Sequence, residues 1–282
     1  MKNKNLGASI RARLLNKAKS EGVDFQLLLT RYALERLLYR LSISTEKEHF
    51  LLKGALLFDL WYDVPLRPTR DIDLLGFGLA EIPHLLTVFK NLCELKVDDG
   101  ITFDSATVKA AEIRKEANYS GTRVTLLGLI EGAKCPVQID IGYGDAVTPA
   151  PESAVYPVMF DDMPKPFLRV YPRYTVVAEK LDAIISLGMA NSRMKDYFDL
   201  WIILRDSQLD HSTLAQAVQA TLHRRGTANP TGIPMGLGEQ FATDTQKNIQ
   251  WNAFVKRNNL KAEPLAATVN FLNNELAFIF KK

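Results

Sequence analysis

The chain has 282 residues, of which 47% are hydrophobic and 24% charged, and its formal charge is +3. This balance is typical of a globular protein, and so small a net charge permits an anionic partner without requiring one. Cys93 and Cys135 lack the spacing of a metal or redox pair, which predicts a reducing compartment without disulfides. No signal-peptide pattern or membrane-length apolar run occurs, so we expect a cytoplasmic protein with no membrane partner.

The first third of the chain alternates between helical and extended patterns. Apolar residues recur there at three- and four-residue spacing, as on one face of a helix, except in two short runs bounded by glycine or proline. The predicted elements, in chain order, are helices over 7–20 and 24–42, an extended run over 49–53, a helix over 55–63, a strand over 71–77 and a helix over 81–96.

Along the rest of the chain, extended sequence patterns are followed by helical ones. Extended patterns cover 101–108, 109–117, 122–130 and 136–144, and six prolines mark residues 144–172 as a long connection. Helical patterns then cover 175–190, 195–206, 211–225, 238–257 and 263–280. The sequence therefore predicts an α/β core with N-terminal helices over residues 1–165, followed by a helical C-terminal lobe over 166–282.

Residues 53–78, KGALLFDLWYDVPLRPTRDIDLLGFG, carry the most chemical information. On a strand, Asp71 and Asp73 share one face while Ile72 and its neighbours point to the other. Two adjacent carboxylates raise each other's pKa unless a cation lies between them, and hard divalent cations prefer such oxygen ligands. A bare Asp-X-Asp is more often a solvated strand edge. The glycine turn at Gly54 favours a site, because backbone can approach a phosphate closely there.

A third carboxylate is predicted at Asp140, in the segment VQIDIGYG. Val137, Ile139 and Ile141 fall on one strand face, which leaves Asp140 on the other. Three carboxylates can hold two metal ions, one activating the attacking hydroxyl and one bridging the triphosphate. The alternative is that Asp140 meets solvent on a half-exposed strand. Asp145 is a weaker candidate.

The order of these motifs resembles the polymerase-β-like nucleotidyltransferase superfamily. More narrowly, LLKGALLFDLW and RPTRDIDLLG, followed by EKLDAII and KDYFDLW, resemble the AbiEii/AbiGii toxin family over residues 24–206. The resemblance implies a polymerase-β-like core with a mixed sheet, metal ligation by Asp71, Asp73 and Asp140, and catalysis with Mg²⁺ or Mn²⁺. Gly54-Ala55 stands where the superfamily usually has Gly-Ser or Gly-Gly. Since Ala55 offers no hydroxyl, we expect phosphate contacts from backbone N–H groups or from Lys53.

The resemblance also implies roles for residues outside the acidic strand. Lys180 lies on an apolar helix stripe and is assigned to the nucleotide phosphates, although such a lysine can also extend to water. Asp199 is expected to orient Lys180 or contact the nucleotide. Asp196 has the same assignment, with helix capping as its alternative. Arg70 and Arg67 flank the acidic strand and either bind phosphate or pair with neighbouring acids.

These residues lead to one functional expectation and two alternatives. The first is a toxin of a bacterial toxin–antitoxin pair, with a separately encoded antitoxin, that transfers NMP from an NTP to RNA, at the 3′ end of tRNA. The second is the same chemistry on a protein or small-molecule hydroxyl, and the third is a catalytically silent binding module. Basic residues in the first two helices are compatible with RNA, but such runs are usually solvated helix faces: Arg11, Arg13, Lys17, Lys19, Arg31, Arg36 and Arg40.

Overall fold

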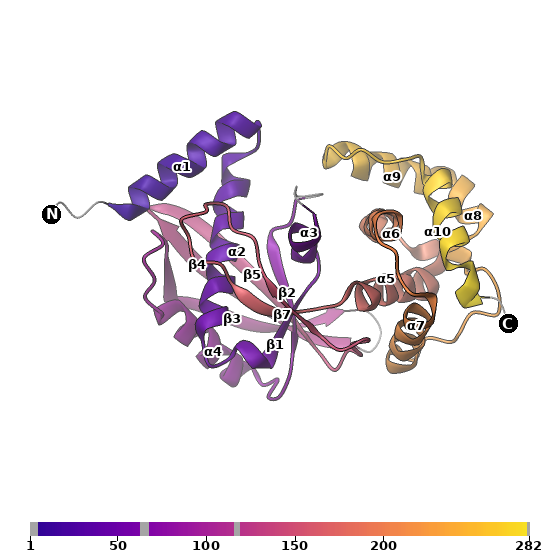
Figure 1. The fold of residues 1–282 in the computed structure, drawn as a ribbon, viewed down its shortest axis with the longest axis horizontal. Helices are drawn as coiled ribbons and strands as arrows, with labels where there is room; N and C mark the ends of the chain where they lie inside the picture. The colour runs from indigo at the N-terminus through magenta and orange to yellow at the C-terminus, as the bar shows by residue number, and fades with distance from the viewer. Residues whose placement is uncertain (1–4, 63–67, 116–118, 281–282) are drawn as a thin grey trace. The chain divides into compact units, whose positions relative to one another are not determined.

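The computed structural model describes residues 5–62, 68–115 and 119–280, and its chain divides into two compact units. The first comprises Met1–Gly144 and Glu152–Val170, and the second comprises Asp145–Pro151 and Tyr171–Lys282. The first unit holds a mixed sheet with helices and the second is helical, so the predicted α/β class is confirmed (Figure 1). The domain division at residue 165 stays a prediction.

A seven-stranded sheet in the order β3-β4-β5-β2-β1-β7-β6 forms the centre of the first unit. The pairs β5–β2 and β1–β7 are parallel and all the other pairs are antiparallel. This arrangement places the Asp-X-Asp strand, β2, in the middle of the sheet. The strands are β1 Phe50–Lys53, β2 Asp71–Gly76, β3 Thr102–Lys115, β4 Tyr119–Ile130, β5 Ala133–Tyr143, β6 Glu152–Val155 and β7 Phe167–Val170.

The helices of the first unit lie where the apolar periodicity predicts them: α1 Leu6–Glu21, α2 Phe25–Ile43, α3 Leu56–Trp61 and α4 Ile82–Glu94. The side chains of Asn5 and Asp24 cap α1 and α2 by accepting hydrogen bonds from the backbone. Ile72 and Leu74 of β2 are buried and line one apolar space with leucines of α2 and with Phe89 of α4. Burial of this face leaves the aspartates of β2 on the opposite face.

Two strand predictions need correction. Residues 101–108 and 109–117 were expected as separate strands, but β3 is a single strand whose register shifts between Asp104 and Lys109. No glycine or proline interrupts the sequence there, and Asp104 and Thr107 make local hydrogen bonds that accommodate a bulge. The connection over 144–172 contains two strands, β6 and β7, that pair with each other at the edge of the sheet. Strands of four residues are too short to show a clear periodicity in sequence.

The second unit consists of helices α5 Arg173–Leu187, α6 Met194–Asp206, α7 His211–Arg225, α8 Glu239–Thr243, α9 Thr245–Arg257 and α10 Leu265–Phe280. Their core includes Tyr197, Phe241 and Trp251, all buried. The helix predicted over 238–257 is two helices, because Asp244 ends α8 and caps α9 by accepting a hydrogen bond from the Lys247 N–H. Across the described parts of the chain, we find no helix with the length and apolar character that a bilayer crossing requires.

Candidate active site

Two rows of polar side chains cross the centre of the sheet, on the face opposite to Ile72 and Leu74. They arise because register partners on adjacent strands point to the same side. The first row joins Asp71 on β2 to Gln138 on β5 and Thr125 on β4. The second row joins Lys53 on β1 to Asp73 on β2, Asp140 on β5 and Arg123 on β4. The structure thus brings the three predicted carboxylates onto neighbouring positions of two parallel strands.

Asp71 and Asp73 are both partly exposed. The Thr69 hydroxyl donates a hydrogen bond of 2.8 Å to Asp71 Oδ1. Gly54 has a φ of 76°, and a Cβ built on it would lie 2.1 Å from Asp73 Oδ2. Only glycine fits this turn, because both the backbone conformation and the nearby carboxylate exclude a side chain.

Asp140 is paired with Arg123, a residue that none of the sequence motifs singles out. Arg123 Nε donates to Asp140 Oδ1 and Arg123 Nη2 donates to Oδ2, both at 2.8 Å. Such a bidentate pair is among the strongest hydrogen-bonded ion pairs in proteins. The hydrogen bond to Asp140 raises the pKa of Arg123, and the charges of Asp71 and Asp73 add to this effect. Both oxygens of Asp140 therefore already have a cationic partner.

The amino-acid sequence nevertheless holds a signal for this pair. Glu131 and Gly132 separate two β patterns, and both have positive φ, as in the two-residue hairpin turns that match the twist of paired strands. The turn pairs Ile130 with Ala133, and counting outward from that pair places Arg123 opposite Asp140. A register fixed by a short turn is therefore enough to identify Arg123 as the neighbour of Asp140.

The donor chemistry at Asp71 and Asp73 fits a hard divalent cation. Mg²⁺ is commonly held by one or two carboxylates together with substrate phosphates, and Gly54 places no Cβ against the Asp73 carboxylate. However, among the described residues no three His, Cys, Asp or Glu side chains are grouped as a metal centre requires. Asp140 forms an ion pair with Arg123, and the three-carboxylate metal site stays a prediction.

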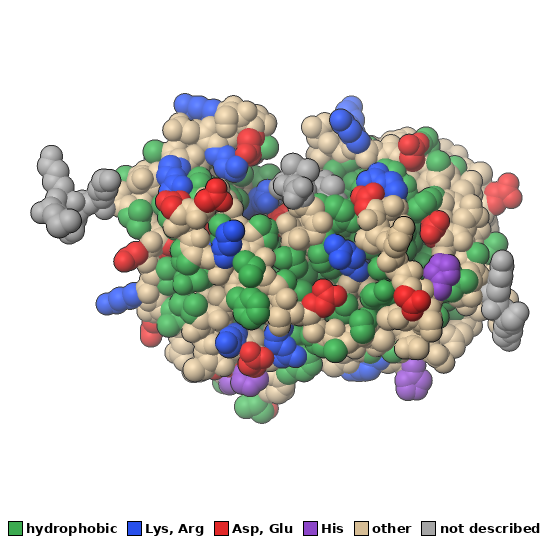
Figure 2. All heavy atoms as spheres, in the orientation of Figure 1, with side chains coloured by type: hydrophobic (Ala, Val, Ile, Leu, Met, Phe, Trp, Pro, Cys, Tyr) green, Lys and Arg blue, Asp and Glu red, His purple; other side chains and the backbone are tan. Residues whose placement is uncertain are grey.

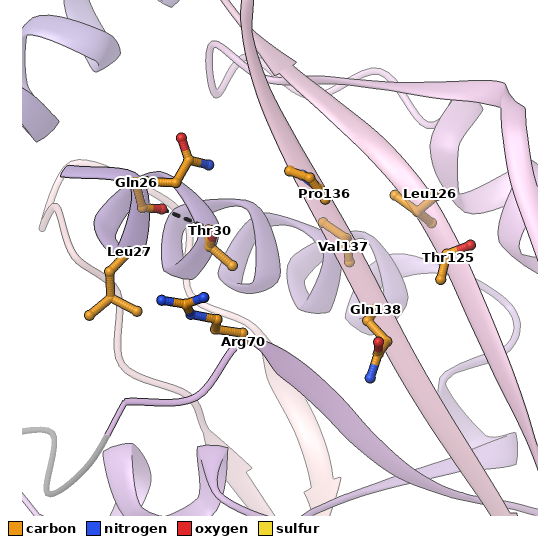
Figure 3. A pocket seen from close by; sticks show the side chains of 9 residues that line it. All are labelled: Gln26, Leu27, Thr30, Arg70, Thr125, Leu126, Pro136, Val137 and Gln138. Atoms are coloured by element: carbon orange, nitrogen blue, oxygen red, sulfur yellow. Dashed lines mark hydrogen bonds between the residues drawn. The ribbon is translucent and has the colours of Figure 1, made fainter. Parts of the chain in front are cut away.

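A pocket of about 350 Å³ lies in the first unit, next to the first polar row (Figure 3). Arg70, which immediately precedes Asp71, lines it together with Gln138 and Thr125 of that row. Arg70 is exposed, and within the described residues its guanidinium has no hydrogen-bonded or ionic partner. Arg67, the other predicted flanking arginine, falls outside the described residues. The remaining lining residues are Gln26, Leu27, Thr30, Leu126, Pro136 and Val137.

The second unit contains a separate cluster around Lys180. Lys180 Nζ donates to Asp199 Oδ2 at 2.7 Å and to Asp196 Oδ1 at 3.1 Å, and both aspartate side chains are buried. Arg193 Nε lies 2.7 Å from the other oxygen of Asp196. Asp196 lies in the first turn of α6, as its capping alternative requires, and its carboxylate also contacts two cations, so that alternative stays open beside the predicted role.

Several of the basic residues expected on a solvated helix face are internal. The interpretation as a solvated face is wrong for Arg36 and Arg40, which are 0% and 2% exposed. Arg40 pairs with the buried Asp99 through two hydrogen bonds, and Arg13 pairs with Asp162. On the face drawn in Figure 2, basic and acidic side chains are interspersed. The guanidinium groups of Arg40 and Arg13 are therefore engaged in ion pairs within the protein.

Residues 36–271 match the protein family described as "Nucleotidyl transferase AbiEii toxin, Type IV TA system". A comparison with curated proteins finds no match. Among solved structures, JHP933 from Helicobacter pylori is similar with a TM-score of 0.53 and 17% identity, over 90% of this chain and 92% of that one. A "putative nucleotidyltransferase" from H. pylori has the same TM-score and identity, over 92% and 96%. At this identity the two structures establish a shared fold.

Proposed function

Because the chain belongs to the AbiEii family of nucleotidyl transferase toxins of type IV toxin–antitoxin systems, we propose that it transfers NMP from an NTP to an RNA hydroxyl, with β2 supplying the metal ligands. Family membership makes the chain a nucleotidyltransferase that uses an NTP and has a separately encoded antitoxin. The observation that carries the proposal is the pair of polar rows, in which Asp71 and Asp73 lie beside Asp140 on the adjacent parallel strand.

In the proposed reaction, the oxygen of the acceptor hydroxyl bonds to the α-phosphorus. The bond from that phosphorus to the oxygen bridging to the β-phosphate breaks, and pyrophosphate leaves. Asp71 and Asp73 would hold Mg²⁺ or Mn²⁺, which when bound neutralises phosphate charge and favours ionisation of the hydroxyl. Asp140 would complete the metal site or accept the hydroxyl proton. Chemistry of this kind depends mainly on positioning and electrostatics.

The residues around the acids would position the nucleotide. The turn at Gly54-Ala55 exposes backbone next to Asp73, and Lys53 places a positive charge in the same row. Arg70 would bind a phosphate at the pocket beside Asp71. None of these contacts needs a hydroxyl at Ala55.

In the second unit, Lys180 would neutralise nucleotide phosphates, with Asp199 and Asp196 holding it in place. The two hydrogen bonds to Lys180 support this proposal, because they fix an otherwise flexible ammonium group.

The class of acceptor molecule is identified by finding which molecule receives the radioactive phosphate of the NTP. Purified protein is incubated with Mg²⁺, each α-³²P-labelled NTP in turn, and either bulk tRNA or RNA-free lysate. We expect label on tRNA, at its 3′ end, and weaker acceptor binding as salt rises. Label on protein alone would replace RNA with a protein acceptor. No label on either would favour a catalytically silent module.

A further inference from the structure

We propose that Arg123 is an internal counter-ion that holds Asp140 in the metal-free enzyme and competes with the divalent cation for that carboxylate. This inference rests on the proposed metal site at Asp71 and Asp73. It makes Arg123 a positioning residue, since it acts through Asp140 and its position relative to the other acids.

Asp140 is buried, with a side chain only 6% exposed, and both of its oxygens accept hydrogen bonds from Arg123. A carboxylate engaged on both oxygens by a planar guanidinium has few lone pairs left for a metal ion. Asp140 would therefore bind a metal ion more strongly if the guanidinium moved away and left its oxygens to the metal.

The three carboxylates concentrate negative charge on one face of the sheet. Asp71, Asp73 and Asp140 place three negative charges on adjacent positions of two strands, and such a cluster is unfavourable without nearby positive charge. Arg123 donates two hydrogen bonds to Asp140 and lies in the same row as Asp140 and Asp73. In the absence of a cation, Arg123 and Lys53 of the same row supply positive charge that the metal would otherwise provide.

The Arg123 side chain is 41% exposed, in contrast to its buried partner Asp140. The guanidinium can swing into solvent without disturbing the core, whereas the carboxylate cannot. The exchange therefore needs a rotamer change of one exposed side chain.

The test is the affinity for Mn²⁺, measured by electron paramagnetic resonance without nucleotide, in the wild type and in Arg123→Gln. We expect Arg123→Gln to bind Mn²⁺ about ten-fold more tightly or better, because a competing positive charge a few ångströms away is removed. Without metal the same variant should unfold at a lower temperature, because Asp140 loses its partner. Mn²⁺ should then raise its melting temperature more than that of the wild type. A residue that is merely structural would lower stability without tightening metal binding.

Three further variants make the test specific. Arg169→Gln removes a comparably exposed arginine of β7 that pairs with Glu48, and it should leave Mn²⁺ affinity unchanged. Arg123→Lys keeps the charge without the bidentate pair and should have intermediate affinity. Arg123→Gln combined with Asp140→Asn should lose the gain in affinity, which shows that the gain comes through Asp140.

The possible outcomes distinguish a failure of the counter-ion role of Arg123 from a failure of the metal site. If wild-type protein binds Mn²⁺ through Asp71 and Asp73 but Arg123→Gln binds it no more tightly, the counter-ion role is overturned and the metal site stands. If neither protein binds Mn²⁺, both the metal site and the role of Arg123 are overturned.

Discussion

Gly54 and Asp73 approach each other so closely that a methyl group on Gly54 would overlap the Asp73 carboxylate, with its carbon 2.1 Å from Oδ2. Gly54 directly follows β1, and Lys53, the last residue of that strand, is the register partner of Asp73 on β2. The glycine turn and the acidic strand are therefore one structural unit, although helix α3 lies between them along the chain.

Gly54→Ala is expected to reduce NMP transfer by about 100-fold or more, because the Asp73 carboxylate must move out of place. Gly78→Ala is the matched control, since Gly78 also has positive φ but meets no atom within 4 Å. Both substitutions should cost about 1–2 kcal/mol of unfolding free energy for the strained backbone. Label transfer and denaturant unfolding measure the two effects. Equal activity in the two variants would show that contact with Asp73 is irrelevant.

Lys180→Met should abolish transfer and also destabilise the protein by about 3–5 kcal/mol, because it leaves Asp196 and Asp199 buried without their shared cation. Adding Asp196→Asn and Asp199→Asn removes the two buried negative charges, so thermal stability should recover while transfer stays lost. Melting curves and label transfer on the same samples check this. Recovery of activity together with stability would give Lys180 a structural role only.

Arg40→Met should lower the unfolding free energy by about 3–5 kcal/mol, because Asp99 is fully buried and would lose its partner. The control is Lys17→Met, which breaks the partly exposed pair with Glu21 on α1 and should change stability by less than about 1 kcal/mol. Denaturant unfolding measures both. A small effect at Arg40 would mean that this side chain reaches solvent, as the sequence pattern suggested.

The parts of the fold that could be predicted are those set by local pattern. Period-3.6 apolar spacing located α1 and α2, and the alternation around Ile72 placed Asp71 and Asp73 on one face. Long-range pairing was harder, because nothing local to β6 or β7 indicates that they complete the sheet. The burial of Arg40 was also hidden, since its partner Asp99 lies 59 residues away.

In the candidate site too, features set by local pattern could be predicted, whereas contacts set by long-range pairing could not. Asp140 could be chosen because isoleucines flank it, but its partner Arg123 required the strand register. That register depends on recognising the two-residue turn at Glu131-Gly132, which is a weaker signal than Asn-Gly or Asp-Gly. In the second unit, the contact of Lys180 with Asp199 joins two helices, and helical periodicity alone gives no such distance.

The most direct test of the central claim compares α-³²P- and γ-³²P-labelled NTP as donors, with tRNA and Mg²⁺, in the wild type, Asp71→Asn, Asp73→Asn and Glu112→Gln. Glu112 is an exposed acid of the same sheet, on the face opposite to Asp73, and serves as the control. We predict transfer of the α-label alone, retained in Glu112→Gln and reduced at least about 100-fold in both aspartate variants. Transfer of the γ-label, or α-label transfer that survives loss of either aspartate, would contradict the account.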